Sequence, residues 1–135
     1  MAVILIDVNM EGQGRHIWMR LQTADWRDFT VGLDLSFRTF REVGLDPASP
    51  DDIVWRFCQG QGLYLLTSNR NDDSEDSLEA TIRSEVTPTS LPIFTLPLPQ
   101  RVYSQPAFLE QVVAKLFEYL LDADNIRGTG RLYLP

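Results

Sequence analysis

The sequence is poor in the side chains that many enzymes use as nucleophiles or as metal ligands. Among 135 residues, Cys58 is the only cysteine and His16 the only histidine. A single cysteine excludes an internal disulfide and a thiolate zinc cluster, and it favours a reducing compartment. A Ser-His-Asp or Cys-His apparatus would need His16, which has no nucleophile motif near it. Carboxylate chemistry remains open, with or without a hard divalent metal.

Positive charge is also scarce, and Lys115 is the only lysine. Twelve basic residues against nineteen acidic ones give a formal net charge of −7. This balance argues against a wide basic surface for nucleic-acid duplexes, although it is compatible with a small nucleic-acid site. No run approaches the ~20 apolar residues of a membrane span, and Asp7 interrupts the apolar N-terminus where a signal peptide would continue. We expect a cytoplasmic location and no membrane attachment.

The hydrophobic pattern predicts one α/β domain over residues 1–135. Hydrophobic residues make up 44% of the chain and charged residues 23%, as in ordinary globular domains. Short apolar or alternating runs predict strands at 3–7, 33–37, 63–67 and 93–96. Helical spacing and breakers predict helices at 15–23, 50–59, around 78–82 and 106–121. This order predicts a three-layer α/β/α sandwich around a mostly parallel sheet. Residues 128–134 would add a strand or wrap the surface.

Three local features refine this prediction. Residues 11–14, which contain two glycines, are expected to form a turn, and the prolines around 93–96 predict an edge or near-edge strand. Ser49 is the expected N-cap of the second helix, with Pro50 at its first position. Asp51 and Asp52 then lie in its first turn, where acids stabilise a helix by ~0.3–1 kcal/mol without any ligand. Which of these two acids faces a cleft is left open.

Asp7 is the strongest candidate for function. It ends an apolar strand, where an ionised carboxylate must be solvated, hydrogen-bonded or bound to a metal. In parallel sheets, polar sites lie beyond the carboxyl ends of the strands. The structural alternative is that Asp7 only accepts backbone N–H groups of the 11–14 turn.

Three motifs occur in a fixed order: Asp-Val-Asn at 7–9, Ser-Pro-Asp-Asp-Ile-Val-Trp at 49–55, and Leu-Leu-Thr-Ser-Asn-Arg-Asn at 65–71. In this order and spacing the chain resembles PIN-like nuclease domains over residues 3–96. The resemblance implies metal-dependent hydrolysis of single-stranded RNA with Mg²⁺ or Mn²⁺. The implied catalytic residues are Asp7, Asp51, Asn69 and Asn71. The implied metal ligands are Asp7, Asp51, Asn69 and Asp72, and the implied phosphate contacts are Arg15 and Arg70.

The chain departs from the family pattern, which generally has aspartate where this sequence has Asn69 and Asn71. Each asparagine in place of an aspartate removes one negative charge from the site, so we expect weak Mg²⁺ or Mn²⁺ binding. Asp72 or Asp73 could supply the missing charge. The chain is then a ribonuclease with an impaired site or a non-catalytic PIN-like binding or regulatory module. A homodimer or a partner protein stays open.

A flavodoxin-like signalling domain is a third possibility, and the sequence disfavours it. Such a domain needs an aspartate at the end of its third strand and a lysine near the end of its fifth. Here the third predicted strand ends in Thr-Ser-Asn at 67–69, and Lys115 falls within a predicted helix.

Overall fold

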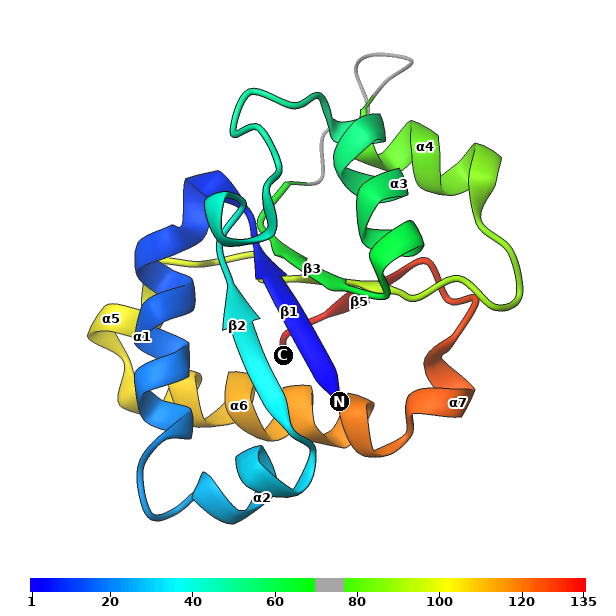
Figure 1. The fold of residues 1–135 in the computed structure, drawn as a ribbon. Coiled ribbons are helices and arrows are strands. Elements are labelled where there is room, and N and C mark those ends of the chain that lie inside the picture. The colour runs from blue at the N-terminus through cyan, green and yellow to red at the C-terminus, as the bar shows by residue number, and fades with distance from the viewer. Residues whose placement is uncertain (70–76) are drawn as a thin grey trace.

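The computed structural model describes residues 1–69 and 77–135, and these form one sheet of five strands (Figure 1). The strands are β1 (Ala2–Ile6), β2 (Leu35–Arg38), β3 (Tyr64–Thr67), β4 (Ile93–Thr95) and β5 (Arg131–Tyr133). Their order across the sheet is β2-β1-β3-β4-β5, and each neighbouring pair is parallel. The predicted α/β class with a parallel sheet is therefore confirmed.

Helices cover both faces of this sheet. They are α1 (Glu11–Leu21), α2 (Arg27–Gly32), α3 (Asp51–Gln61), α4 (Leu78–Glu85), α5 (Arg101–Ser104), α6 (Pro106–Leu121) and α7 (Ala123–Ile126), with 3₁₀ turns η1 (Val8–Met10) and η2 (Arg41–Val43). One core joins α1 and α6 to the sheet, and a second joins α3 and α4 to its other face (Figure 1). The predicted three-layer sandwich is thus confirmed. No helix in the described ranges has the length and apolarity needed to cross a membrane.

Strand alternation assigns each side chain to one of the two cores. Ile4 and Ile6 of β1 pack in the core with α1 and α6, whereas Leu5 between them packs in the core with α3 and α4. Leu65 of β3 and Ile93 of β4 also face α3 and α4. Because successive strand residues point to opposite faces, the residue two positions after each of these lies on the same face.

The residues two positions after Leu5, Leu65 and Ile93 are Asp7, Thr67 and Thr95. All three follow the last apolar residue that their strand presents to α3 and α4. Thr67 and Thr95 are fully buried, and the Asp7 N–H donates to the carbonyl oxygen of Leu66 at 2.9 Å, which extends the β1–β3 ladder. The carboxyl edge of the sheet is therefore polar on this one face.

The strand order places a topological switch point between β1 and β3. From β1 the chain runs to β2 on one side, and it later returns to add β3 on the other side. Ligands of open parallel sheets bind at the carboxyl ends of the two strands that flank such a point. Asp7 follows β1 and Asn69 follows β3, so both candidate residues lie at this position.

The turn predicted at residues 11–14 is wrong, because α1 begins at Glu11. Gly14 is buried in this helix, and a Cβ added to it would lie 2.6 Å from the side chain of Ile6. This glycine therefore allows the close approach of α1 to β1. Such a tertiary contact cannot be distinguished from a turn signal in the local sequence.

Two glycine-to-alanine substitutions are expected to have opposite effects on stability. Gly14→Ala should lower the free energy of unfolding by about 1–3 kcal/mol, because the methyl group overpacks against Ile6. Gly60→Ala in α3 should raise it by about 0.5–1 kcal/mol, since nothing lies within 4 Å of the added Cβ. Urea unfolding of both variants tests this expectation. A destabilised Gly60→Ala or an unaffected Gly14→Ala contradicts it.

Several other boundaries differ from the prediction by one or two residues. Helix α3 begins at Asp51, with Pro50 in extended conformation (φ −67°, ψ 160°) before it, so the predicted Ser49 cap is wrong. Strand β2 begins at Leu35 because Asp34 adopts a left-handed φ of 48°. Strand β4 is one strand in from the edge, in agreement with the near-edge prediction, and residues 131–133 add the edge strand β5.

Candidate functional site

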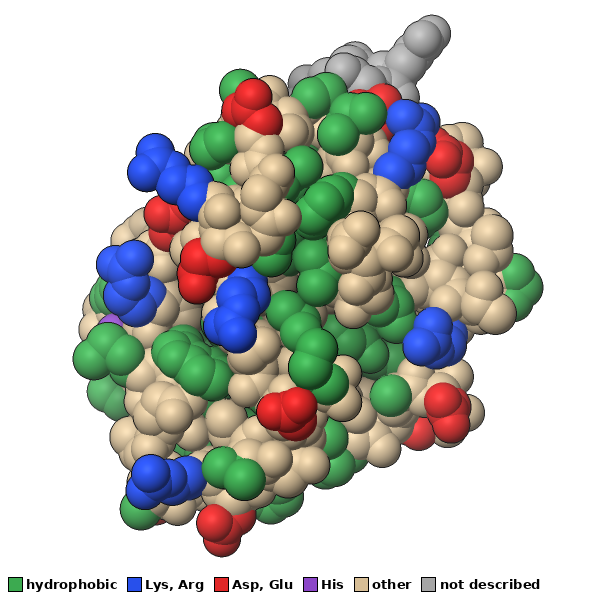
Figure 2. All heavy atoms as spheres, in the orientation of Figure 1, with side chains coloured by type: hydrophobic (Ala, Val, Ile, Leu, Met, Phe, Trp, Pro, Cys, Tyr) green, Lys and Arg blue, Asp and Glu red, His purple; other side chains and the backbone are tan. Residues whose placement is uncertain are grey.

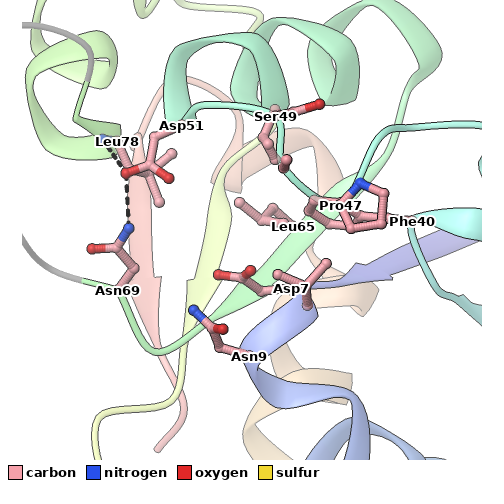
Figure 3. A pocket seen from close by; sticks show the side chains of 12 residues that line it. Asp7, Asn9, Phe40, Pro47, Ser49, Asp51, Leu65, Asn69 and Leu78 are labelled. Atoms are coloured by element: carbon pink, nitrogen blue, oxygen red, sulfur yellow. Dashed lines mark hydrogen bonds between the residues drawn. The ribbon is translucent and has the colours of Figure 1, made fainter.

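A cavity of about 290 Å³ opens at the carboxyl edge of β1 and β3 (Figure 3). We call it the Asp7 cavity. Three polar segments line it: residues 7–9 after β1, Ser49 and Asp51 at the start of α3, and Asn69 after β3. Its remaining lining residues are Phe40, Pro47, Ala48, Val54, Leu65 and Leu78. Asp7, Asp51 and Asn69 are therefore brought together, although they come from three separate motifs.

The Asp7 carboxylate is held at one oxygen by the neighbouring strand. Thr67 Oγ1 donates to Asp7 Oδ2 at 2.6 Å. Burial raises the pKa of Asp7 above its ordinary value, the negative charge of Asp51 also raises it, and hydrogen bonds from Thr67 and from the backbone at 8–9 oppose the rise only in part. An ionised Asp7 is thus short of solvation, and a cation in the cavity would supply the missing stabilisation.

The structural alternative for Asp7, a turn at 11–14 that donates to it, is not found. Those residues are helical, and the backbone groups that hydrogen-bond to Asp7 belong to Val8 and Asn9. In Figure 3 the side chains of Asp7 and Asn9 lie on one side of the cavity, opposite Asp51.

Asp51, on α3, is hydrogen-bonded both to the segment after β3 and to α4. Its Oδ2 accepts a hydrogen bond from Asn69 Nδ2 at 2.9 Å and one from the backbone N–H of Leu78 at 3.2 Å (Figure 3). Leu78 is the first residue of α4, so Asp51 stabilises the start of that helix. Asp52 instead pairs with Arg56 at 3.1 Å and does not line the cavity. The acid that faces the cleft is therefore Asp51.

Thr67 connects Asn69 to Asp7. Its Oγ1 accepts the backbone N–H of Asn69 at 3.0 Å and donates its own proton to Asp7. Thr67 belongs to the third motif, but its role was not predicted from the sequence. The available signal was a hydroxyl in a strand whose four residues are all buried, because a buried hydroxyl needs a partner.

The oxygen atoms around the cavity suit a hard divalent cation. Asp7 and Asp51 supply carboxylates, and Asn9 and Asn69 also line the cavity, with Nδ2 of Asn69 turned toward Asp51. Mg²⁺ is commonly bound by one or two carboxylates with water completing its shell, so this donor set fits it or Mn²⁺. Within residues 1–69 and 77–135, no group of three His, Cys, Asp or Glu side chains is arranged to hold a metal. A metal here would therefore depend on two acids and neutral oxygens.

The other implied residues lie elsewhere. Arg15 is exposed on α1 and lines a separate cavity of about 240 Å³ with Trp18 and Arg38. The predicted site residues Arg70, Asn71, Asp72 and Asp73 lie outside the described residues. Neither the hydrolytic role of the site nor its phosphate contacts follow from these positions.

The single cysteine and the single histidine take no part in this site. Cys58 is buried, and burial raises the pKa of its thiol to about 12, so the thiolate that a nucleophile needs is not formed at neutral pH. His16 packs edge-on against Tyr103, with ring centroids 5.2 Å apart. Neither residue lines the Asp7 cavity.

Comparisons with known proteins do not assign this chain to a family. No protein-family model, curated protein or solved structure matches this chain. The likeness to PIN-like domains therefore stays a prediction from the three sequence motifs.

Proposed function

We propose that the Asp7 cavity binds a divalent cation, Mg²⁺ or Mn²⁺, and that the chain is a PIN-like domain derived from metal-dependent ribonucleases. The observation that carries this proposal is the meeting of Asp7 and Asp51 in one cavity at the switch point of the sheet. Two neighbouring carboxylates repel each other, as the effect of Asp51 on the pKa of Asp7 shows. A bound cation would turn this repulsion into attraction.

The residues of the chain have distinct tasks in this proposal. Asp7 and Asp51 hold the cation, Thr67 orients Asp7, and Asn69 orients Asp51 through the contacts described above. A divalent ion held in this way activates water and neutralises the charge of a scissile phosphate. The substrate class that fits the resemblance is single-stranded RNA.

Affinity for RNA is expected to be low. The net charge is −7, and Figure 2 shows Lys and Arg side chains scattered singly among Asp and Glu on the face drawn there. Because phosphate contacts provide most of the salt-dependent affinity for nucleic acids, a surface of this kind favours short or transient contacts.

A second candidate is a non-catalytic PIN-like binding or regulatory module. Its supporting observation is that Asp51 Oδ2 already accepts two hydrogen bonds, from Asn69 and from Leu78. The amide of Asn69 thus stabilises the carboxylate without any cation. In this case the cavity keeps its polar shape and loses the affinity for metal that catalysis requires.

The proposed cation site is tested by Mn²⁺ soaks of crystals and measurement of anomalous density. We expect a peak within about 2.0–2.6 Å of an oxygen of both Asp7 and Asp51. The peak should disappear in Asp51→Asn and persist in Asp52→Asn, a matched control one residue away whose carboxylate pairs with Arg56. No peak at millimolar Mn²⁺, or a peak that survives in Asp51→Asn, contradicts the proposal.

A further inference from the structure

Arg131 on the edge strand β5 reaches the segment that follows β3. Its Nη1 donates to the backbone oxygen of Asn69 at 2.8 Å and to Thr95 Oγ1 at 2.6 Å. Its Nε donates to Glu79 Oε1 of α4 at 3.0 Å. One guanidinium therefore connects β4, α4 and the segment that carries Asn69.

The burial of Arg131 is unusual for an arginine. Its side chain is only 7% exposed, and Nη2 is buried with no hydrogen-bond partner in the described part of the chain. A buried donor without an acceptor costs stability. An apolar side chain at this position would avoid that cost, so packing alone does not account for the guanidinium.

The register of β5 explains how the side chain reaches this place. Arg131 lies beside Ile93 of β4, whose side chain packs in the core with α3 and α4. Arg131 therefore projects on the same face of the sheet as Asp7 and Thr67. Its long side chain extends toward the carboxyl edge, where it contacts Thr95 and Asn69.

The contact with Arg131 completes the fixation of Asn69. The backbone N–H of Asn69 donates to Thr67, and its backbone oxygen accepts from Arg131. A residue held at both peptide groups presents its side chain in a restricted direction. The Asn69 amide is thereby directed at Asp51, to which it donates at 2.9 Å.

We propose that Arg131 is a positioning residue, which holds Asn69 against Asp51 and so sets the geometry of the candidate metal site. This inference rests on the proposed function of that site. Arginine is required because its fork donates in two directions at once, to Glu79 through Nε and to Asn69 and Thr95 through Nη1. Lysine keeps the charge and lacks the fork.

The test compares Arg131→Lys with Arg56→Lys. Arg56 is a matched control, because its fork also binds a carboxylate of α4, Glu85, at 3.0 Å through Nε and 2.6 Å through Nη2, without touching Asn69. We expect the side-chain amide signal of Asn69 in ¹H–¹⁵N spectra to shift in Arg131→Lys and its hydrogen exchange to accelerate at least tenfold. Mn²⁺ affinity should fall about 10–100-fold, as for other partners that orient metal ligands. Arg56→Lys should change neither readout.

Two readouts separate failure of this inference from failure of the proposed metal site. Unchanged exchange of Asn69 in Arg131→Lys overturns the inference, and so does faster exchange with unaltered Mn²⁺ affinity. Absence of Mn²⁺ binding in the wild type and in Asn69→Asp refutes the metal site, while the exchange measurement still decides whether Arg131 holds Asn69. If Arg131→Lys does not fold, Glu79→Gln removes the charge partner of Arg131 and should cause a smaller change in the same direction.

Discussion

We expect Asn69→Asp, alone or combined with Asn71→Asp, to raise the affinity for Mn²⁺ by about tenfold or more. Asn69 lies against Asp51 at the edge of the cavity, so a carboxylate there would add a third negative charge beside Asp7 and Asp51. Each added carboxylate strengthens the attraction of an oxygen site for a divalent ion. A tenfold change corresponds to about 1.4 kcal/mol, a modest gain for one more charge in a partly buried site.

The same substitution should make thermal stability depend on metal. Without a cation, the carboxylate at position 69 repels Asp51 and no longer donates the amide hydrogen bond, so the Tm in EDTA should fall below that of the wild type. With Mn²⁺ the Tm should rise above its EDTA value, because ligand binding to the folded state stabilises it. Calorimetric titration and thermal melts in EDTA and in Mn²⁺ measure both effects.

Asn125→Asp is the matched control for this prediction. Asn125 Nδ2 donates to Asp122 Oδ1 at 2.6 Å, so the same amide-to-carboxylate change is made beside an acid outside the Asp7 cavity. It should leave Mn²⁺ affinity unchanged. Equal affinities for the wild type and Asn69→Asp would show that this amide is not at a metal site.

Elements that depend on local pattern were predictable from the sequence. Helix α6 occupies residues 106–121 as predicted, because its apolar residues recur at helical spacing over sixteen residues and Pro106 marks its start. Strand β3 differs from its prediction by one residue. Features that depend on tertiary contact were not predictable: Gly14 packs against Ile6, and Ser49 lines the cavity in place of capping α3.

The candidate site likewise contains residues that were predictable from the sequence and a contact that was not. Asp7, Asp51 and Asn69 were predictable as neighbours, because the carboxyl ends of parallel strands meet at one edge of a sheet. The contact of Arg131 with Asn69 joins residues 62 positions apart and follows from the register of β5, which no local pattern encodes. The interpretation of the site as part of a PIN-like domain stays a proposal.

Strand order does not decide between the functional alternatives. The order β2-β1-β3-β4-β5 is that of flavodoxin-like sheets. The residues argue against a signalling domain of that type, since Thr67 ends β3 and Lys115 lies on α6, where it pairs with Glu118 at 3.3 Å. Because one fold serves many functions, the side chains at the carboxyl edge carry the argument.

Asp7→Asn is expected to abolish Mn²⁺-dependent cleavage of single-stranded RNA. Asp7 is the acid at the end of β1 that faces the proposed cation, and an amide in its place removes the charge that holds the ion and supports water activation. Metal catalysis contributes several kcal/mol, so the rate should fall more than ~100-fold. The assay uses low salt, where the few arginine contacts to RNA are least screened.

Loss of activity in this variant should not reflect unfolding. The raised pKa of Asp7 means that the folded state binds its proton more tightly than the unfolded chain, so the stability from this group is present below about pH 3.8 and is lost as pH rises through the raised pKa. A neutral Asn escapes that loss and can still accept the hydrogen bond from Thr67. The Tm of Asp7→Asn should therefore equal or exceed that of the wild type at pH 7, with a smaller difference at pH 3.5.

Asp52→Asn completes the experiment, because it removes a carboxylate from the same helix turn as Asp51 without changing the cavity lining. Its cleavage rate should match that of the wild type. Cleavage that persists in Asp7→Asn indicates that a contaminating nuclease, and not this site, cleaves the RNA. Cleavage absent from the wild type and present in Asn69→Asp/Asn71→Asp would favour the non-catalytic module, since two restored charges would then be what separates this chain from an active enzyme.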